Sequence, residues 1–113
     1  WVTGSNTLSA SITPSATTSK ILILTNFSTT GPNSWNAATV YRDATNLGDA
    51  TYGFGRIYSQ DAYSYISTAY LDSPSSTSSL TYQAYFRVGI ATKTALLNGD
   101  GTMGTITLME IGA

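Results

Sequence analysis

The chain of 113 residues contains no cysteine and no histidine. Without cysteine there can be no disulfide and no thiolate metal site. Cysteine usage therefore does not indicate whether the protein works in an oxidising or a reducing compartment. Without histidine the chain lacks the commonest general base and the commonest transition-metal ligand. We therefore expect no cofactor and no metal, and we expect that the protein is not an enzyme.

Charge and long apolar runs are also scarce. Charged residues make up 10% of the chain, against roughly a quarter in ordinary soluble domains. The net charge is −1 and the five basic residues are scattered, which argues against nucleic acid as a partner because phosphate binding needs clustered Lys and Arg. The longest apolar run, Ile21 to Leu24, is four residues. We expect no membrane insertion.

Hydroxyl residues take the place of charge, with 15 serines and 19 threonines. Threonine suits strands because its branched Cβ fits the pleat, and serine is common in turns. The length fits one domain, which we place at residues 8–113 after a linker at residues 1–7. Because the chain begins with Trp1 and not with Met, we expect it to be a piece of a longer protein.

The clearest periodic stretch is Leu80 to Val88, where apolar and polar residues alternate. Such alternation predicts a half-buried strand. A lone strand cannot cover its apolar face, so the remaining periodic segments are expected to pair with it. These are residues 8–13, 20–27, 37–42, 51–55, 62–71, 95–97 and 105–111.

About eight strands at roughly ten-residue spacing, separated by turn signals, predict an all-β, antiparallel β-sandwich of the jelly-roll type. An immunoglobulin-like sandwich is the competing fold, but its Cys, Trp, Cys framework is missing. Residues 28–36 form a predicted loop with Trp35 near its end, and a hairpin is expected after Arg42. The segment Lys20 to Phe27 is apolar on both faces, so one face must be covered by a loop or by another subunit.

Few residues suggest catalysis or ion binding. Glycoside hydrolysis needs two carboxylates across a cleft, but four of the six acids lie in predicted turns, where aspartate caps its own backbone. Residues 98–101, Asn-Gly-Asp-Gly, lack the further acids of a calcium loop and fit a hairpin turn better. Glu110 lies between Met109 and Ile111. It either points outward or pairs with Arg42, Arg56 or Arg87, including one from a neighbouring chain.

Tyrosine is in excess, with eight residues, five of them between Tyr52 and Tyr70. Its flat apolar ring and hydroxyl suit binding surfaces, including surfaces that bind sugars. Because Tyr63 and Tyr65 share one face of a strand and Tyr70 takes the other, we expect about half of the tyrosines to be structural.

The order and spacing of several segments resemble the C-terminal domains of tailed-phage virion proteins, many of them from marine phages and cyanophages. The segments are Tyr70 to Pro74, Leu80 to Phe86 and Ile106 to Ile111, preceded by Thr13-Pro14, Ser19 to Ile23 and Arg42-Asp43. The resemblance covers nearly the whole chain from Leu8. It implies a compact jelly roll, similar to the tumour-necrosis-factor head, that assembles as a homotrimer on tail fibres or capsids.

The resulting hypothesis is a trimeric tail-fibre or spike tip on the virion surface that contacts other virion proteins and binds a host glycan or receptor. Three weak sites would gain avidity. The candidate contact residues are aromatic and polar: Asn33, Trp35, Asn36, Tyr58, Tyr63 and Tyr65. The candidate trimer interface lies on the two strands at residues 20–27 and 105–111: Ile21, Leu22, Ile23, Leu24, Ile106, Leu108, Met109 and Glu110.

Two alternatives stay open. One is a capsid decoration or head-fibre protein that stabilises the shell and contacts no host molecule. The other is a monomeric carbohydrate-binding module, which predicts a tyrosine platform exposed on one sheet.

Overall fold

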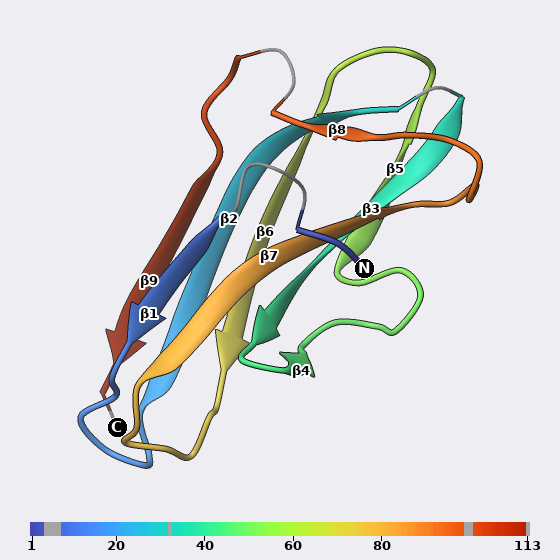
Figure 1. The fold of residues 1–113 in the computed structure, drawn as a ribbon. Helices are drawn as coiled ribbons and strands as arrows, with labels where there is room; N and C mark the ends of the chain where they lie inside the picture. Colours follow the sequence, from blue (N-terminus) through green and yellow to red (C-terminus); the bar gives the residue numbers. More distant parts are fainter. Residues whose placement is uncertain (4–7, 32, 99–100, 113) are drawn as a thin grey trace.

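The computed structural model describes residues 1–3, 8–31, 33–98 and 101–112. Two antiparallel sheets face each other, and no helix occurs in these residues (Figure 1). The all-β sandwich predicted from the sequence is confirmed. The described part contains nine strands: β1 Ser9–Ile12, β2 Lys20–Thr30, β3 Ser34–Arg42, β4 Thr45–Asn46, β5 Gly55–Ser59, β6 Ser64–Asp72, β7 Leu80–Val88, β8 Leu96–Leu97 and β9 Thr105–Ile111.

The first sheet has the order β1-β7-β3, and both β4 and β5 pair with the far edge of β3. The second sheet is centred on β2, which pairs with β6 on one side and with β8 and β9 on the other. The chain therefore crosses repeatedly between the sheets, and each sheet combines early and late strands (Figure 1). The arrangement is that of a β-sandwich, and the finer jelly-roll type stays a prediction.

Alternation along β7 and β2 builds the core between the sheets. Leu80, Tyr82, Ala84 and Phe86 of β7 are buried and alternate with half-buried residues. On β2, Ile21, Ile23 and Phe27 point inward. The buried side chains form two clusters, one around Phe27 and Phe86 and one around Ile23 and Tyr82. Burial of these side chains is the main stabilising contribution to the fold.

Several predicted strands match closely, and the segment at residues 80–88 and the last strand match at both ends. The strand predicted at residues 51–55 is wrong, because residues 50–52 form a turn and only Gly55 belongs to a strand, β5. Gly53 adopts a φ of 60° there. A Cβ on Gly53 would lie 2.2 Å from the Ala38 carbonyl oxygen, so only glycine fits this close approach.

Two further boundaries differ from prediction. Strand β3 begins at Ser34, so Trp35 lies in a strand and not in a loop. Strand β2 continues to Thr30. Residues 1–3, expected to be linker, lie against β7 through paired backbone hydrogen bonds between Val2 and Phe86. The turn predicted at 98–101 lies partly outside the described residues. The described residues contain no helix, and therefore no helix that could cross a membrane.

Candidate functional site

The outer face of the second sheet exposes aliphatic side chains. We call Leu22, Leu24, Leu71, Met109 and Ile111 the aliphatic face. Leu22 lies between Leu71 of β6 and Met109 of β9 in the strand register. Leu71, Met109 and Ile111 are each exposed by about 45%, and Leu24 is 37% exposed. An exposed apolar patch on adjacent strands is typical of an interaction surface.

Alternation divides the predicted interface residues between two environments. Ile21 and Ile23 are fully buried in the core, and the half-buried Ile106 and Leu108 pack against the same cluster. These four residues are therefore removed from the candidate interface, because side chains on their side of each strand point to the opposite sheet. Leu22, Leu24 and Met109 lie on the aliphatic face. The second apolar face of β2 thus stays uncovered within the described chain.

Glu110 does not pair with an arginine within the described residues. Its Oε1 accepts hydrogen bonds from the backbone N–H and the hydroxyl of Ser15, at 2.7 Å and 2.6 Å. These hydrogen bonds from Ser15 lower the pKa of the Glu110 carboxyl. Glu110 therefore holds the loop between β1 and β2 in place, and we remove Glu110 from the candidate interface.

A hollow adjoins the aliphatic face. It has a volume of about 470 Å³ and is lined by Leu24, Asn26, Ser67, Ala69, Thr105 and Thr107, among others. Asn26 accepts a hydrogen bond from the Ser67 hydroxyl at 2.9 Å. Short hydroxyl and amide side chains therefore form a polar rim beside the aliphatic side chains.

The outer face of the first sheet carries a different cluster. We call Trp1, Trp35, Tyr52, Arg56 and Arg87 the aromatic–arginine face. The guanidinium carbon of Arg56 lies 4.4 Å from the Tyr52 ring centroid and 5.8 Å from that of Trp35. The guanidinium carbon of Arg87 lies 5.6 Å from the Trp1 centroid and 5.8 Å from that of Trp35. These distances are within the range of cation–π interactions.

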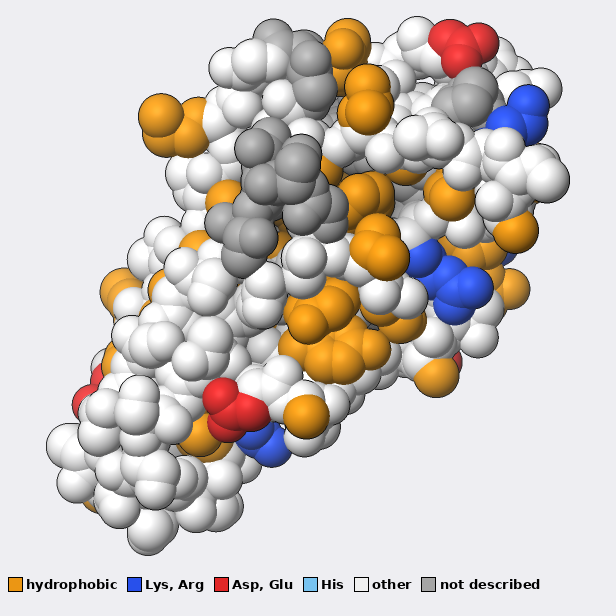
Figure 2. Space-filling view, in the orientation of Figure 1, with side chains coloured by type: hydrophobic (Ala, Val, Ile, Leu, Met, Phe, Trp, Pro, Cys, Tyr) orange, Lys and Arg blue, Asp and Glu red, His pale blue; other side chains and the backbone are white. Residues whose placement is uncertain are grey.

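The strand register explains this gathering. Ala37 of β3 pairs with Arg56 of β5 on one side and with Arg87 of β7 on the other. Ala37 is fully buried although it lies on the outer side of the sheet, since the two long side chains and the neighbouring rings cover it. Figure 2 views the molecule from the side of β7 and shows Lys or Arg side chains beside hydrophobic ones on this face.

Gly89 fixes the position of Trp35. Its backbone N–H donates to the Trp35 carbonyl oxygen at 2.8 Å, and a Cβ on Gly89 would lie 2.1 Å from the Trp35 ring. The indole therefore lies directly on the Gly89 backbone, and it also neighbours the two arginines and Tyr52, whose ring centroid is 5.7 Å away.

Three of the predicted contact residues lie together on this side of the molecule. Trp35 pairs in register with Tyr58, and the Tyr58 hydroxyl donates to Asn33 Oδ1 at 2.9 Å. Tyr58 is 59% exposed, and Asn33 is exposed in the turn before β3. This group is continuous with the aromatic–arginine face.

The other three predicted contact residues lie elsewhere. Asn36 is fully buried, and its side-chain oxygen and nitrogen have no hydrogen-bond partner among the described residues. It cannot contact a ligand at the surface, because its neighbour Trp35 takes the outward position. Tyr65 lies on the opposite sheet, in register with Ser28. Tyr63 lines a separate hollow of about 260 Å³ with Asp61 and Leu96.

Sequence reasoning missed Trp1, Tyr52, Arg56 and Arg87 as members of one surface. Arg56 and Arg87 are far apart in the sequence and meet only across β3, so finding them needed the register of three strands. Alternation does place Arg87 on the polar side of β7. The segment of Arg56 was not predicted to be a strand, so no pattern indicated its face.

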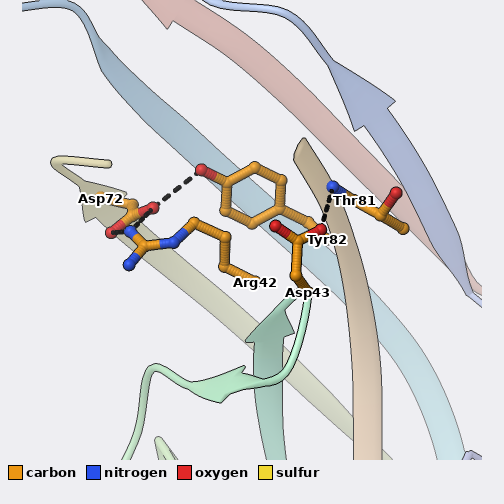
Figure 3. A network of polar contacts seen from close by, with 5 residues as sticks. All are labelled: Arg42, Asp43, Asp72, Thr81 and Tyr82. Carbon is orange, nitrogen blue, oxygen red and sulfur yellow. Dashed lines mark hydrogen bonds and ion pairs between the residues drawn. The ribbon is translucent and has the colours of Figure 1, made fainter. Parts of the chain in front are cut away.

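A buried polar network joins the two sheets near the end of β3 (Figure 3). Arg42 Nη1 donates to both carboxylate oxygens of Asp72, at 2.8 Å and 2.7 Å. The hydroxyl of Tyr82 donates to Asp72 Oδ2 at 2.7 Å. Arg42 and Tyr82 are register partners in the first sheet, whereas Asp72 ends β6 in the second.

This network is satisfied internally. Burial, and then the hydrogen bond to Asp72, raise the pKa of the Tyr82 hydroxyl. Burial alone would lower the pKa of Arg42, but the hydrogen bond and the charge of Asp72 outweigh it, so the pKa of Arg42 is raised. Arg42 and Tyr82 therefore keep their charge states near neutral pH, and the network acts as a clamp between the sheets.

Comparison with models of protein families, with curated proteins and with solved structures finds no match. In the described part of the chain, no three His, Cys, Asp or Glu side chains gather closely enough to hold a metal ion. The two outer faces are therefore the surfaces on which a functional proposal can be built.

Proposed function

We propose that the chain is a non-enzymatic virion domain of a tailed phage, a homotrimeric tail-fibre or spike tip that attaches to a glycan or receptor on the host surface. The observation that carries this proposal is the aliphatic face. The virion setting is supported by the resemblance of the chain's segments to tailed-phage virion domains. The aromatic–arginine face, on the other side of the sandwich, supports the attachment role.

The composition of the aliphatic face favours self-association. Interface centres are depleted in charged residues and surrounded by a polar rim. Leu22 and Leu24 lie on the central strand β2, Met109 lies opposite Leu22 on β9, and Lys20 and Ile111 pair at the end of these strands. Short polar side chains border the aliphatic ones along the same strands.

The size of the molecule sets the area that an interface would need. A specific interface buries about 800 Å² on each partner, roughly a seventh of this chain's 5814 Å² of accessible surface. To reach this area, the interface must include the polar rim as well as the aliphatic face. In a three-fold assembly the aliphatic faces of three copies meet around the axis, whereas a free glycan offers no such aliphatic surface.

The test uses the chain's two methionines. Met109 lies on the aliphatic face and is 45% exposed, whereas Met103 precedes β9 and is 83% exposed. We expect Met109→Lys to raise the concentration at which the trimer half dissociates at least tenfold, because a charge would be desolvated at the interface. For a monomer–trimer equilibrium this is a hundredfold change in the dissociation constant, or about 2.8 kcal/mol per trimer. Met103→Lys is the matched control and should leave it unchanged.

Sedimentation velocity over a dilution series measures this effect, with circular dichroism to verify folding. Equal dissociation of the two variants would overturn the assignment of the interface to the aliphatic face.

Attachment is tested separately, by binding of the fluorescently labelled chain to host cells and to capsids that lack it. The proposal predicts binding to cells. Binding to capsids alone would replace it with the capsid-decoration alternative.

A further inference from the structure

We propose that the aromatic–arginine face binds an acidic carbohydrate. Arg56 and Arg87 contact the anionic group of the sugar, and the exposed rings of Tyr52 and Tyr58 stack against its pyranose ring. This inference names the ligand class for the attachment role proposed above, and it rests on that proposal.

Among the residues that the structure describes, the two arginines of this face have no carboxylate partner. The salt bridge that the described residues contain joins Arg42 to Asp72. Neither Arg56 nor Arg87 lies within salt-bridge distance of an acid in the same part of the chain, and the hydrogen bond that Arg87 makes, to the Thr51 carbonyl oxygen, is long at 3.4 Å. Two cations thus lie on either side of Ala37, without a carboxylate partner in the described part of the chain, and the whole chain has only five basic residues.

Asp49 is the acid of the adjoining turn, and its carboxylate has other partners. Asp49 Oδ1 accepts the backbone N–H groups of Thr51 and Tyr52, both at 2.8 Å. These hydrogen bonds hold the turn that carries Tyr52. An external anion therefore does not have to displace an internal ion pair to reach Arg56 or Arg87.

The rings hold the guanidinium groups in place. Each arginine contacts two aromatic rings, so part of its side-chain freedom is already lost before a ligand binds. Pre-ordering of this kind increases affinity, since less entropy is lost on association. The planar guanidinium has paired donors that match the geometry of a carboxylate or sulfate.

Exposed tyrosines supply the apolar part of the site. Tyr52 is 45% exposed and Tyr58 is 59% exposed. Both lie next to Trp35, because the Tyr52 ring centroid is 5.7 Å from that of Trp35 and Tyr58 is its register partner. A tyrosine ring gives a flat surface for the C–H face of a sugar and a hydroxyl for hydrogen bonding. Asn33, which accepts from the Tyr58 hydroxyl, adds an exposed amide at the border.

The small number of cations favours a sugar over a nucleic acid. A nucleic-acid site tracks several phosphates with a basic groove, whereas this face offers two arginines in a chain with a net charge of −1. Single-stranded DNA is therefore included in the test as the competing ligand.

Binding is measured by isothermal titration calorimetry on the full chain. The acidic probes are trigalacturonate, sialyllactose and a chondroitin sulfate hexasaccharide, which separate carboxylate from sulfate recognition. The neutral probes are the methyl ester of trigalacturonate and lactose, and the competitor is a short oligo(dT). We expect at least one acidic probe to bind at least tenfold more tightly than its neutral counterpart.

The variants are Arg56→Gln and Arg87→Gln, with Lys93→Gln as the matched control, because Lys93 is an exposed cation in the loop after β7. Each arginine variant should weaken binding of the acidic probe at least fivefold, and the lysine variant should not. Tyr58→Ala removes an exposed ring without uncovering Ala37, and it should weaken binding by a similar factor.

Three results would overturn the inference: equal binding of acidic and neutral probes, tighter binding of oligo(dT), or arginine variants that lower only the melting temperature. The last would mean that the arginines merely cover Ala37. Because this face is on the opposite side from the aliphatic face, all variants should keep the oligomeric mass of the wild type. A trimer without acidic-sugar binding refutes this inference alone, whereas a monomer refutes the proposed assembly.

Discussion

The network of Arg42, Asp72 and Tyr82 should be a main determinant of stability. Asp72→Asn removes the negative charge that compensates Arg42 and leaves one carbonyl oxygen for two donors. Breaking a buried ion pair from one side costs about 3–5 kcal/mol. The Arg42 side chain is 23% exposed, and the asparagine keeps one acceptor, so we expect a loss of about 2–3 kcal/mol.

This loss is large compared with the stability of a domain, which is about 5–15 kcal/mol. With an unfolding entropy of roughly 2 cal/mol/K per residue, it corresponds to a fall in melting temperature of about 10 °C. Thermal and urea denaturation followed by circular dichroism measure it, at one fixed protein concentration because assembly would add to the apparent stability.

Asp61→Asn is the control. Asp61 is exposed and has a positive φ of 57°, which asparagine tolerates, so the expected change is below about 0.5 kcal/mol. A double-mutant cycle with Tyr82→Phe tests the coupling. The Tyr82 substitution should cost less in the Asp72→Asn background, with a coupling energy of about 1 kcal/mol. Additive effects, or an Asp72→Asn variant as stable as the wild type, would refute the inter-sheet clamp.

Two further predictions concern single contacts. Gly89→Ala places a Cβ against the Trp35 indole, so we expect a loss of about 1–3 kcal/mol and an altered tryptophan fluorescence spectrum; an unchanged spectrum would contradict the packing. The hydrogen bonds from Ser15 lower the pKa of Glu110 below its ordinary value of 4.5. The ionised carboxylate therefore stabilises the fold above pH 4.5. This stabilisation is lost as the pH falls through the lower pKa that Glu110 has in the folded protein. Glu110→Gln should therefore be less stable than the wild type at pH 7, and the difference should shrink below about pH 4.5 in melting experiments; a difference independent of pH would exclude a role for the charge.

Much of the fold follows from alternation. The segments Leu80–Val88 and Thr105–Ile111 were predicted with both ends correct, because each has one face on the core and one toward solvent. The strand at residues 51–55 was predicted wrongly for the same reason. The alternation of Tyr52, Gly53 and Phe54 mimics a strand, but the conformation of Gly53 depends on its contact with β3, which no local pattern contains.

The candidate site was predictable only in part. Trp35 and Tyr58 were selected for their rings, and the strand register places them side by side. Asn36 was selected because its segment was expected to be a loop. Since β3 in fact begins at Ser34, alternation points the Asn36 side chain toward the core. Arg56 and Arg87 meet across Ala37 through two separate strand pairings, a relation between three distant segments. The virion role and the trimer remain predictions.

The most direct test of the account is the mass of the unmodified chain in solution, measured by multi-angle light scattering over a dilution series. The account predicts a mass near three times 11.9 kDa that persists on dilution, because the aliphatic face of each copy is covered by another copy. A monomer at all concentrations would contradict it. The aliphatic face would then be an uncovered sheet surface, and a monomeric carbohydrate-binding module would become the better explanation.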